Sequence, residues 1–233
     1  MEKKGLKKHI VVLTGAGISA ESGVKTFRDA DGLWEGHDVM QVATPQGFRD
    51  NPGLVLQFYN ERRQQLKTVE PNDAHKNLKT LEKDFKVTII TQNVDDLHER
   101  AGSSNILHLH GELLKARSTR YPEKIYVWTE DLNLGDTDDK GFQLRPHIVW
   151  FGEDVPLIEK AIDICYTADI LVIIGTSLQV YPASNLINYT QPKIPIYYID
   201  PKPADVDNSI IKVIAKPATK GTEELLEILK SQS

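Results

Sequence analysis

The chain has 233 residues, 40% of them hydrophobic and 26% charged, a composition that fits one large globular domain and excludes disordered and fibrous classes. Its formal net charge of −5 gives the whole chain no electrostatic reason to bind nucleic acid or an anionic membrane. The single cysteine, Cys165, excludes an intrachain disulfide and a zinc site of four thiolates. Because no apolar run is long enough to span a membrane, we expect a soluble, cytoplasmic protein.

Short runs of β-branched residues recur along the chain and predict strands. They cover residues 9–14, 87–91, 106–109, 147–151, 170–174, 196–199 and 210–214. Most are continuously apolar, which is typical of strands buried on both faces of a parallel sheet. Helical patterns lie between them, and a helix over 156–168 places Cys165 on its buried face. These elements predict an α/β fold with a Rossmann-like, doubly wound parallel sheet.

Two stretches break the alternation of strands and helices. Residues 35–85 carry two predicted helices and no strand, and residues 112–145 are polar and irregular. We interpret both as parts of one small module, partly helical and partly irregular, that is inserted into the sheet domain. The Rossmann-like sheet domain would then consist of residues 1–34, 86–111 and 146–233.

The first predicted strand is followed by GAGISA (15–20), which fits the G-x-G-x-x-G/A pattern of dinucleotide-binding loops. Taken alone, this segment could also be a plain tight turn. A dehydrogenase of the ordinary kind would carry an Asp or Glu about 20 residues later to hold the ribose. TFRDADGLW (26–34) stands there instead, which argues against that class. Glycines and small polar residues also follow the later strands, so we expect the ligand at the carboxyl edge of the sheet.

Six segments together resemble the sirtuin (Sir2) family of NAD-dependent protein deacylases. They are GAGISAESG (15–23), TFRDADGLW (26–34), TQNVD (91–95), LHG (109–111), RPHIVWFGE (145–153) and GTSLQVYPAS (175–184). The resemblance covers nearly the whole chain in the right order. It implies that an acylated protein lysine reacts with NAD⁺, and that the products are free lysine, nicotinamide and O-acyl-ADP-ribose.

The resemblance implies that His110 is the general base that takes a proton from a ribose hydroxyl, a role that suits an imidazole near neutral pH. Asn93, also catalytic, and Asp95 would hold the nicotinamide carboxamide, and Gln92 would contact its ribose. His108 is expected to point to the other face of its strand and to have no catalytic role.

The same resemblance implies the remaining contacts with NAD. Phe27 would cover the ribose and Arg28 would meet the pyrophosphate as a charge-assisted donor. Asp200 stands where an Asn is common, could accept from a ribose hydroxyl, and would disfavour a 2′-phosphorylated cofactor. The other implied cofactor residues are Gly15, Ala16, Gly17, Ser19, Ala20, Trp34, Gly175, Thr176, Ser177 and Ala218.

The substrate side can be predicted further. The implied peptide contacts, where an acylated peptide would pair as an added strand, are Val149, Phe151, Gly152, Glu153 and Val180. A helix over 52–66 places Tyr59 and Arg62 one turn apart, and an arginine with a phenol would select an acyl group ending in a carboxylate. This pair is similar to that of class III sirtuins, in which a small residue matching Ala43 widens the pocket. Without the resemblance, both residues would be interpreted as a solvated helix face.

One departure from the family concerns metal. Sirtuins of this type usually carry two C-x-x-C pairs between the HG and RPHIVWFGE segments, whereas residues 112–144 contain no cysteine, and Ser118 stands about where the first is expected. We therefore expect no zinc. A small apolar cluster is predicted to take its place, formed by Tyr121, Tyr126, Trp128 and Leu132.

The leading hypothesis is an NAD-dependent lysine deacylase that prefers succinyl or malonyl groups to acetyl. The partners expected are acylated lysines in proteins or peptides, with neither nucleic acid nor membrane. Two alternatives remain: an NAD-dependent mono-ADP-ribosyltransferase, and a weakly active NAD-binding interaction module. Tyr59 and Arg62 argue against the first, and His110, Asn93 and Asp95 argue against the second.

Overall fold

A computed structural model describes residues 7–24, 33–34, 36–207 and 209–231. In this part of the chain six parallel strands form one large sheet, in the spatial order β11-β10-β9-β1-β4-β5. The strands are β1 (His9–Thr14), β4 (Lys86–Thr91), β5 (Ile106–His108), β9 (Ile170–Ile174), β10 (Ile196–Ile199) and β11 (Ile211–Ile214). The predicted doubly wound parallel sheet is confirmed.

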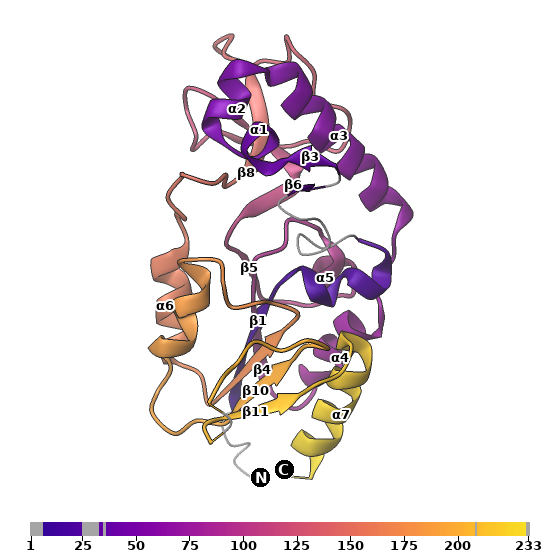
Figure 1. The fold of residues 1–233 in the computed structure, drawn as a ribbon, viewed down its shortest axis with the longest axis vertical. Helices are drawn as coiled ribbons and strands as arrows, with labels where there is room; N and C mark the ends of the chain where they lie inside the picture. Colours follow the sequence, from indigo (N-terminus) through magenta and orange to yellow (C-terminus); the bar gives the residue numbers. More distant parts are fainter. Residues whose placement is uncertain (1–6, 25–32, 35, 208, 232–233) are drawn as a thin grey trace, which may run out of the picture.

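Helices cover both faces of the large sheet, as Figure 1 shows. They are α4 (Asp73–Leu81) and α7 (Ala218–Lys230) on one face, and α6 (Ile158–Tyr166) and η4 (Ala183–Tyr189) on the other. Ile10 and Val12 of β1 pack in the first layer, and Val11 and Leu13 pack in the second. Cys165 is buried in the second layer, where desolvation raises the pKa of its thiol to about 12. Cys165 is therefore a core residue, as predicted. With this raised pKa its thiol is not ionised at neutral pH.

The strand order reverses between β1 and β9. From β1 the sheet continues through β4 on one side, and through β9 on the other. The loops that follow these two strands touch, because Gly15 N donates to Ile174 O (3.0 Å) and Gly17 N donates to Gly175 O (2.9 Å). Gly175 has φ +63, and a side chain on Gly17 or Gly175 would collide with the backbone of the opposite loop. Open α/β sheets bind ligands at such a reversal point.

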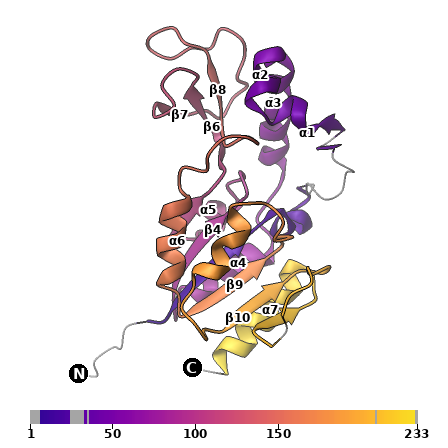
Figure 2. The same ribbon diagram turned by 60° about the vertical axis from the view of Figure 1, so that its left-hand side comes forward.

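A small module lies beyond the carboxyl edge of the large sheet (Figures 1 and 2). Its elements are β2 (Leu33–Trp34), β3 (His37–Asp38), α1 (Val39–Val42), α2 (Pro45–Asp50), α3 (Pro52–Thr68), β6 (Gly111–Ser118), β7 (Ile125–Val127) and β8 (Leu144–Ile148). Asn51 caps α3, since its side chain accepts from Leu54 N at 3.1 Å. Because the module lies beyond this edge of the sheet, it stands next to the reversal point.

Parts of this arrangement differ from the sequence-based expectation. The stretch 112–145 is not irregular throughout, because β6, β7 and β8 form an antiparallel sheet in the order β7-β6-β8. Its strands carry Arg117 and Arg145, whose charges hide the strand pattern and are balanced in the fold by Glu153. The strand expected over 147–151 is β8, which ends at Ile148 and belongs to this sheet rather than to the parallel one.

Two more elements differ. The dinucleotide-binding pattern is typical of a loop that opens an α-helix, whereas residues 15–23 form a pair of 3₁₀ turns, η1 (Ala16–Ile18) and η2 (Ala20–Ser22). The helix α4, which the predicted boundaries place in the module, packs under the large sheet instead. The residue that caps α4, Asn72, joins the helix to the loop after β1, since its Nδ2 donates to Ile18 O at 2.8 Å.

Within the described residues, none of the helices combines the length and apolar character needed to cross a bilayer.

Hydrogen bonds around Ser118 hold the polar segment that follows β6. The buried Ser118 hydroxyl donates to Asp138 Oδ2 (2.7 Å) and accepts from the amides of Arg120 and Tyr121. Asp138 Oδ1 accepts from two further amides of its own turn. The predicted apolar cluster forms only in part, from Tyr126, Trp128 and Leu132 with neighbours on α3, β6 and β8, namely Leu56, Ala116 and Leu144. Tyr121 lies apart from it and contacts the Phe142 ring edge.

We expect Ser118→Ala to lower the free energy of unfolding by about 1–3 kcal/mol, because it leaves a buried carboxylate oxygen and two amides without their partner. Urea unfolding followed by circular dichroism measures the change. Ser209→Ala is the matched control, since it removes an exposed hydroxyl that bonds Asp207 at 2.6 Å. Equal, small changes in both variants would show that Ser118 does not hold the module.

Candidate active site

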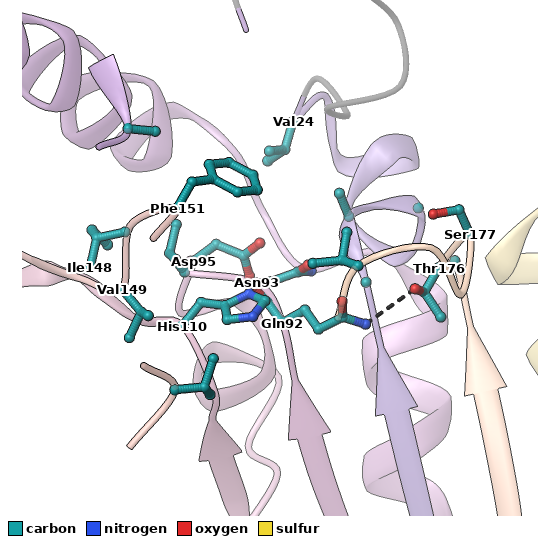
Figure 3. A pocket seen from close by; sticks show the side chains of 18 of the residues that line it. Val24, Gln92, Asn93, Asp95, His110, Ile148, Val149, Phe151, Thr176 and Ser177 are labelled. Carbon is teal, nitrogen blue, oxygen red and sulfur yellow. Dashed lines mark hydrogen bonds between the residues drawn. The ribbon is translucent and has the colours of Figure 1, made fainter. Parts of the chain in front are cut away.

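A cavity of about 1060 Å³ lies between the carboxyl edge of the large sheet and the small module. Loops after β1, β4, β5, β9 and β10 line it from below, and residues 148–155 and α3 line it from above. The predicted site residues that line it are Gly15, Ala16, Gly17, Ala20, Ala43, Tyr59, Gln92, Asn93, Asp95, His110, Val149, Phe151, Gly152, Glu153, Gly175, Thr176, Ser177, Val180, Asp200 and Ala218. Figure 3 shows the part of the cavity around His110.

The other predicted residues do not line the cavity or cannot be placed. Ser19 is fully buried behind it. Arg62 lies beside the Phe58 ring, with its guanidinium carbon 3.9 Å from the ring centre, and donates to Phe58 O. Phe27 and Arg28 fall outside the described residues, and Trp34 belongs to β2 but its side chain is not described.

His110 is held in one orientation at the end of β5. Its Nδ1 lies 3.0 Å from Gln92 O, and a carbonyl oxygen can only accept, so Nδ1 carries the proton and Nε2 keeps a lone pair. Burial lowers the pKa of His110 below its ordinary value. The imidazole is therefore neutral at physiological pH and can accept a proton at Nε2, which is the state that a general base needs.

Three polar side chains form a connected group beside His110. Ser19 Oγ donates to Asp95 Oδ2 (3.0 Å) and accepts from Asn93 Nδ2 (3.2 Å). Asp95 Oδ1 accepts from Leu97 N and so also begins the short helix α5 (Leu97–Arg100). Burial raises the pKa of Asp95. Ser19 thus fixes both residues from behind, and both line the cavity wall.

Gln92, next to this group in the chain, is bonded to the reversal point of the sheet, and apolar side chains lie over the group. Gln92 Nε2 donates to Thr176 Oγ1 at 3.1 Å, the dashed line in Figure 3. In the same view Phe151 and Val24 point toward each other above Asp95. A planar polar group bound at this place would meet amide and carboxyl groups on one side and apolar side chains on the other.

In a comparison with protein families, the model of the Sir2 family matches residues 15–182 of this chain. The chain belongs to the Sir2 family. A protein of Helicobacter pylori (strain ATCC 700392 / 26695) named NAD-dependent protein deacylase is 64% identical over 195 residues, which is 84% of this chain and 85% of that protein. One of the same name from Bacteroides thetaiotaomicron is 55% identical over 229 residues, 95% of this chain and 98% of that protein. The crystal structure of a Sir2 homologue–NAD complex superposes with a TM-score of 0.84 at 35% identity, covering 97% and 91% of the two chains.

This Sir2-family cavity also contains residues that the sequence reasoning did not single out. Trp150 is buried, and its Nε1 donates to the hydroxyl of Tyr59 at 2.9 Å. Burial raises the pKa of Tyr59, which therefore remains a neutral phenol. Trp150 lies inside RPHIVWFGE, so this motif could have identified it as a site residue. Glu21 also lines the cavity, and its carboxylate accepts from the amide and hydroxyl of Thr219 at the start of α7.

The side chain of Glu153, a predicted peptide contact that lines the cavity, also anchors the turn that carries it. Its carboxylate binds Arg145 through both nitrogens (2.7 and 2.8 Å), Arg117 at 3.0 Å and Trp150 N at 2.8 Å. Burial raises the pKa of Glu153, but the bonds from Arg145 outweigh this and the net pKa is lowered. Glu153 is thus a charged anchor that fixes the 149–153 turn against β6 and β8.

The described residues contain no group of three or more His, Cys, Asp or Glu side chains placed to hold a metal ion.

Proposed function

We propose that this chain is an NAD-dependent protein deacylase, and that it prefers lysine acyl groups ending in a carboxylate. The observation that carries the proposal is the single cavity that joins the glycine loops of the reversal point to Tyr59 of α3, with His110 between them. The two curated relatives described above are both named NAD-dependent protein deacylase, which supports the general activity. The acyl preference is supported by Tyr59 and Arg62 of α3 and by the small residue Ala43.

The cavity residues fit NAD. Its volume is at the upper end of the range for small-molecule sites, as a dinucleotide requires. The glycines at 15, 17 and 175 keep side chains out of the reversal point, where a pyrophosphate can approach the backbone. Asp200 is buried at the end of β10 and lines the far end of the cavity, where it would face the adenosine ribose. When bound, NAD supplies a nicotinamide leaving group and a ribose hydroxyl that receives the acyl group.

The residues of the chain would contribute position and one proton transfer. Asn93 and Asp95, fixed by Ser19, would orient the carboxamide without being consumed. His110 would take the hydroxyl proton at Nε2 while its Nδ1–H stays on Gln92 O. Phe151 and Val24 would keep water from the reacting atoms.

The peptide would lie along the 149–153 turn, near Val180. Most amides of this turn are already bonded inside the chain, since Val149 N donates to His110 O and Phe151 N donates to Ala43 O. Trp150 N and Glu153 N are bonded within the turn itself. We therefore expect the peptide to pair chiefly with carbonyl groups of the turn, which is still compatible with main-chain recognition and low sequence selectivity.

The acyl group would enter between Ala43 and Tyr59. Ala43 leaves room at this wall, and Tyr59 presents a neutral phenol there. Arg62 lies one turn further along α3, and its long side chain can turn from the Phe58 ring toward a carboxylate. The gain from such a turn is a charge-assisted hydrogen bond in a site shielded from water.

One assay tests both parts of the proposal. The protein is incubated with NAD⁺ and matched succinyl-, malonyl- and acetyl-lysine peptides, and peptide mass is followed by mass spectrometry. We expect NAD-dependent loss of all three groups, fastest for succinyl or malonyl. No loss of any acyl group would overturn the deacylase proposal, and faster loss of acetyl would overturn the preference. A gain of ADP-ribose mass on added protein would instead support a mono-ADP-ribosyltransferase.

A further inference from the structure

His108 lies at the end of β5, two residues before His110, and its side chain is only 9% exposed. It does not line the cavity as His110 does, because β5 ends at His108 and the chain turns at residues 109 and 110. Its Nδ1 is 3.1 Å from Asn93 O, and its Nε2 is 2.8 Å from Glu99 Oε1 on α5. The ring thus joins the segment that carries Asn93 to the helix behind it.

Three successive carbonyl groups of residues 92–94 are bonded to the segment 108–113. Gln92 O faces His110 Nδ1 (3.0 Å), Asn93 O faces His108 Nδ1 (3.1 Å), and Val94 O accepts from Leu113 N (2.8 Å). The backbone that carries Asn93 therefore follows the position of the two histidines. Of the three bonds, the one from His108 is the only one backed by a carboxylate, that of Glu99.

We propose that His108, paired with Glu99, is a positioning residue that holds the Asn93–Asp95 segment in its reactive place, and that it must be charged to do so. This inference rests on the proposed function. Both ring nitrogens face groups that only accept, a carbonyl and a carboxylate, so both bonds exist together only when the ring is an imidazolium. The two histidines would then work in opposite protonation states, His110 neutral and His108 charged.

The charges around His108 favour this state. Burial lowers its pKa, but the hydrogen bond and charge of Glu99 outweigh burial, and the net pKa is raised above the ordinary value. The titratable and charged groups near the ring are Glu99 and His98 on α5, Glu112 and Lys115 on β6, and Asp95 and Asp96 before α5. Lys115 is bound to Glu112 at 2.6 Å, so the neighbourhood remains predominantly acidic.

The sign of the pH effect follows from these directions. Deacylation should rise as pH increases through the lowered pKa of His110, and should fall again as pH increases through the raised pKa of His108. In the second step one of the two bonds of His108 is lost with its proton. The position of the alkaline limb should depend on Glu99, which does not touch the cavity.

One variant of Glu99 with a matched control, and two variants of His108, test the proposal. Glu99→Gln keeps an acceptor for Nε2 but removes the charge, so the alkaline limb of kcat/KM should move to lower pH. Glu70→Gln is the matched control, since Glu70 is an exposed carboxylate that also contacts α5, through Arg100. His108→Phe should lower kcat about tenfold or more with little change in the KM for peptide, because misplacement by an ångström has effects of this size. His108→Asn, whose amide can still donate to Asn93 O, should recover much of that loss and lack the alkaline limb.

Nuclear magnetic resonance titration of the histidine ring protons gives a readout that needs no activity. The pKa of His108 should lie above that of His110 in the wild type and should fall in Glu99→Gln. If the wild type does not deacylate, the proposed function fails while this titration still tests the pair. An unshifted alkaline limb in Glu99→Gln, or equal losses in His108→Phe and His108→Asn, would overturn the positioning role.

Discussion

His110→Ala should lower kcat for deacylation by about 10²–10⁴-fold, the usual contribution of a positioned general base. The Nε2 atom of His110 carries the free lone pair, because Nδ1 donates to Gln92 O. Alanine removes this base and its bond to Gln92 O, while Ser19 still bonds the side chains of Asn93 and Asp95. Binding of NAD⁺, measured by calorimetry, should therefore change little. The loss should appear in kcat rather than in either KM.

The pH profile gives an independent check of the same residue. Burial lowers the pKa of His110, so the acid limb of kcat/KM in the wild type should lie below pH 6.5, the unperturbed value for histidine. This limb should disappear from the residual activity of His110→Ala. His9→Ala is the control, because His9 lies at the opposite end of β1 and bonds Thr88 and Thr167. An acid limb that persists in His110→Ala would assign it to another group.

The parallel sheet and the edge that carries the site could be predicted because they depend on local patterns. Continuous apolar runs identify strands buried on both faces, and the short polar segments after them must meet at one edge. Gly15, Gln92, His110 and Gly175 line one cavity for this reason. The spatial order of the strands, by contrast, depends on contacts between segments far apart in the chain, and only the structure gives it.

The module was harder to predict because its stability depends on paired charges. Arg117 and Arg145 make β6 and β8 resemble exposed polar chain, and only the fold shows that Glu153 accepts from both. The sequence likewise gives His108 no special mark, because its partner is the backbone carbonyl of Asn93. Backbone partners of side chains are invisible in a sequence, so residues of this kind are found only in a structure.

Arg62→Met should lower kcat/KM for succinyl-lysine by roughly 10–150-fold, which corresponds to about 1.5–3 kcal/mol for a lost hydrogen bond to a charged group. Deacetylation should change by much less, because an acetyl group has no carboxylate to bind. Methionine matches the aliphatic part of arginine and can still pack on the Phe58 ring, against which Arg62 now lies at 3.9 Å. The structure of α3 should therefore be preserved, and the comparison isolates the charge.

Two further variants make the result specific to this side chain. Tyr59→Phe removes the hydroxyl that Trp150 Nε1 contacts, and should also reduce desuccinylation more than deacetylation. Arg49→Met removes an exposed arginine of α2 that bonds Gln46, and should affect neither reaction. Kinetics with paired succinyl and acetyl peptides of one sequence measure all three variants. Equal losses on both peptides in Arg62→Met would mean that Arg62 supports the helix and does not recognise the acyl carboxylate. A selective loss would show that the guanidinium, which lies on Phe58 in this structure, turns toward the cavity when such a substrate enters.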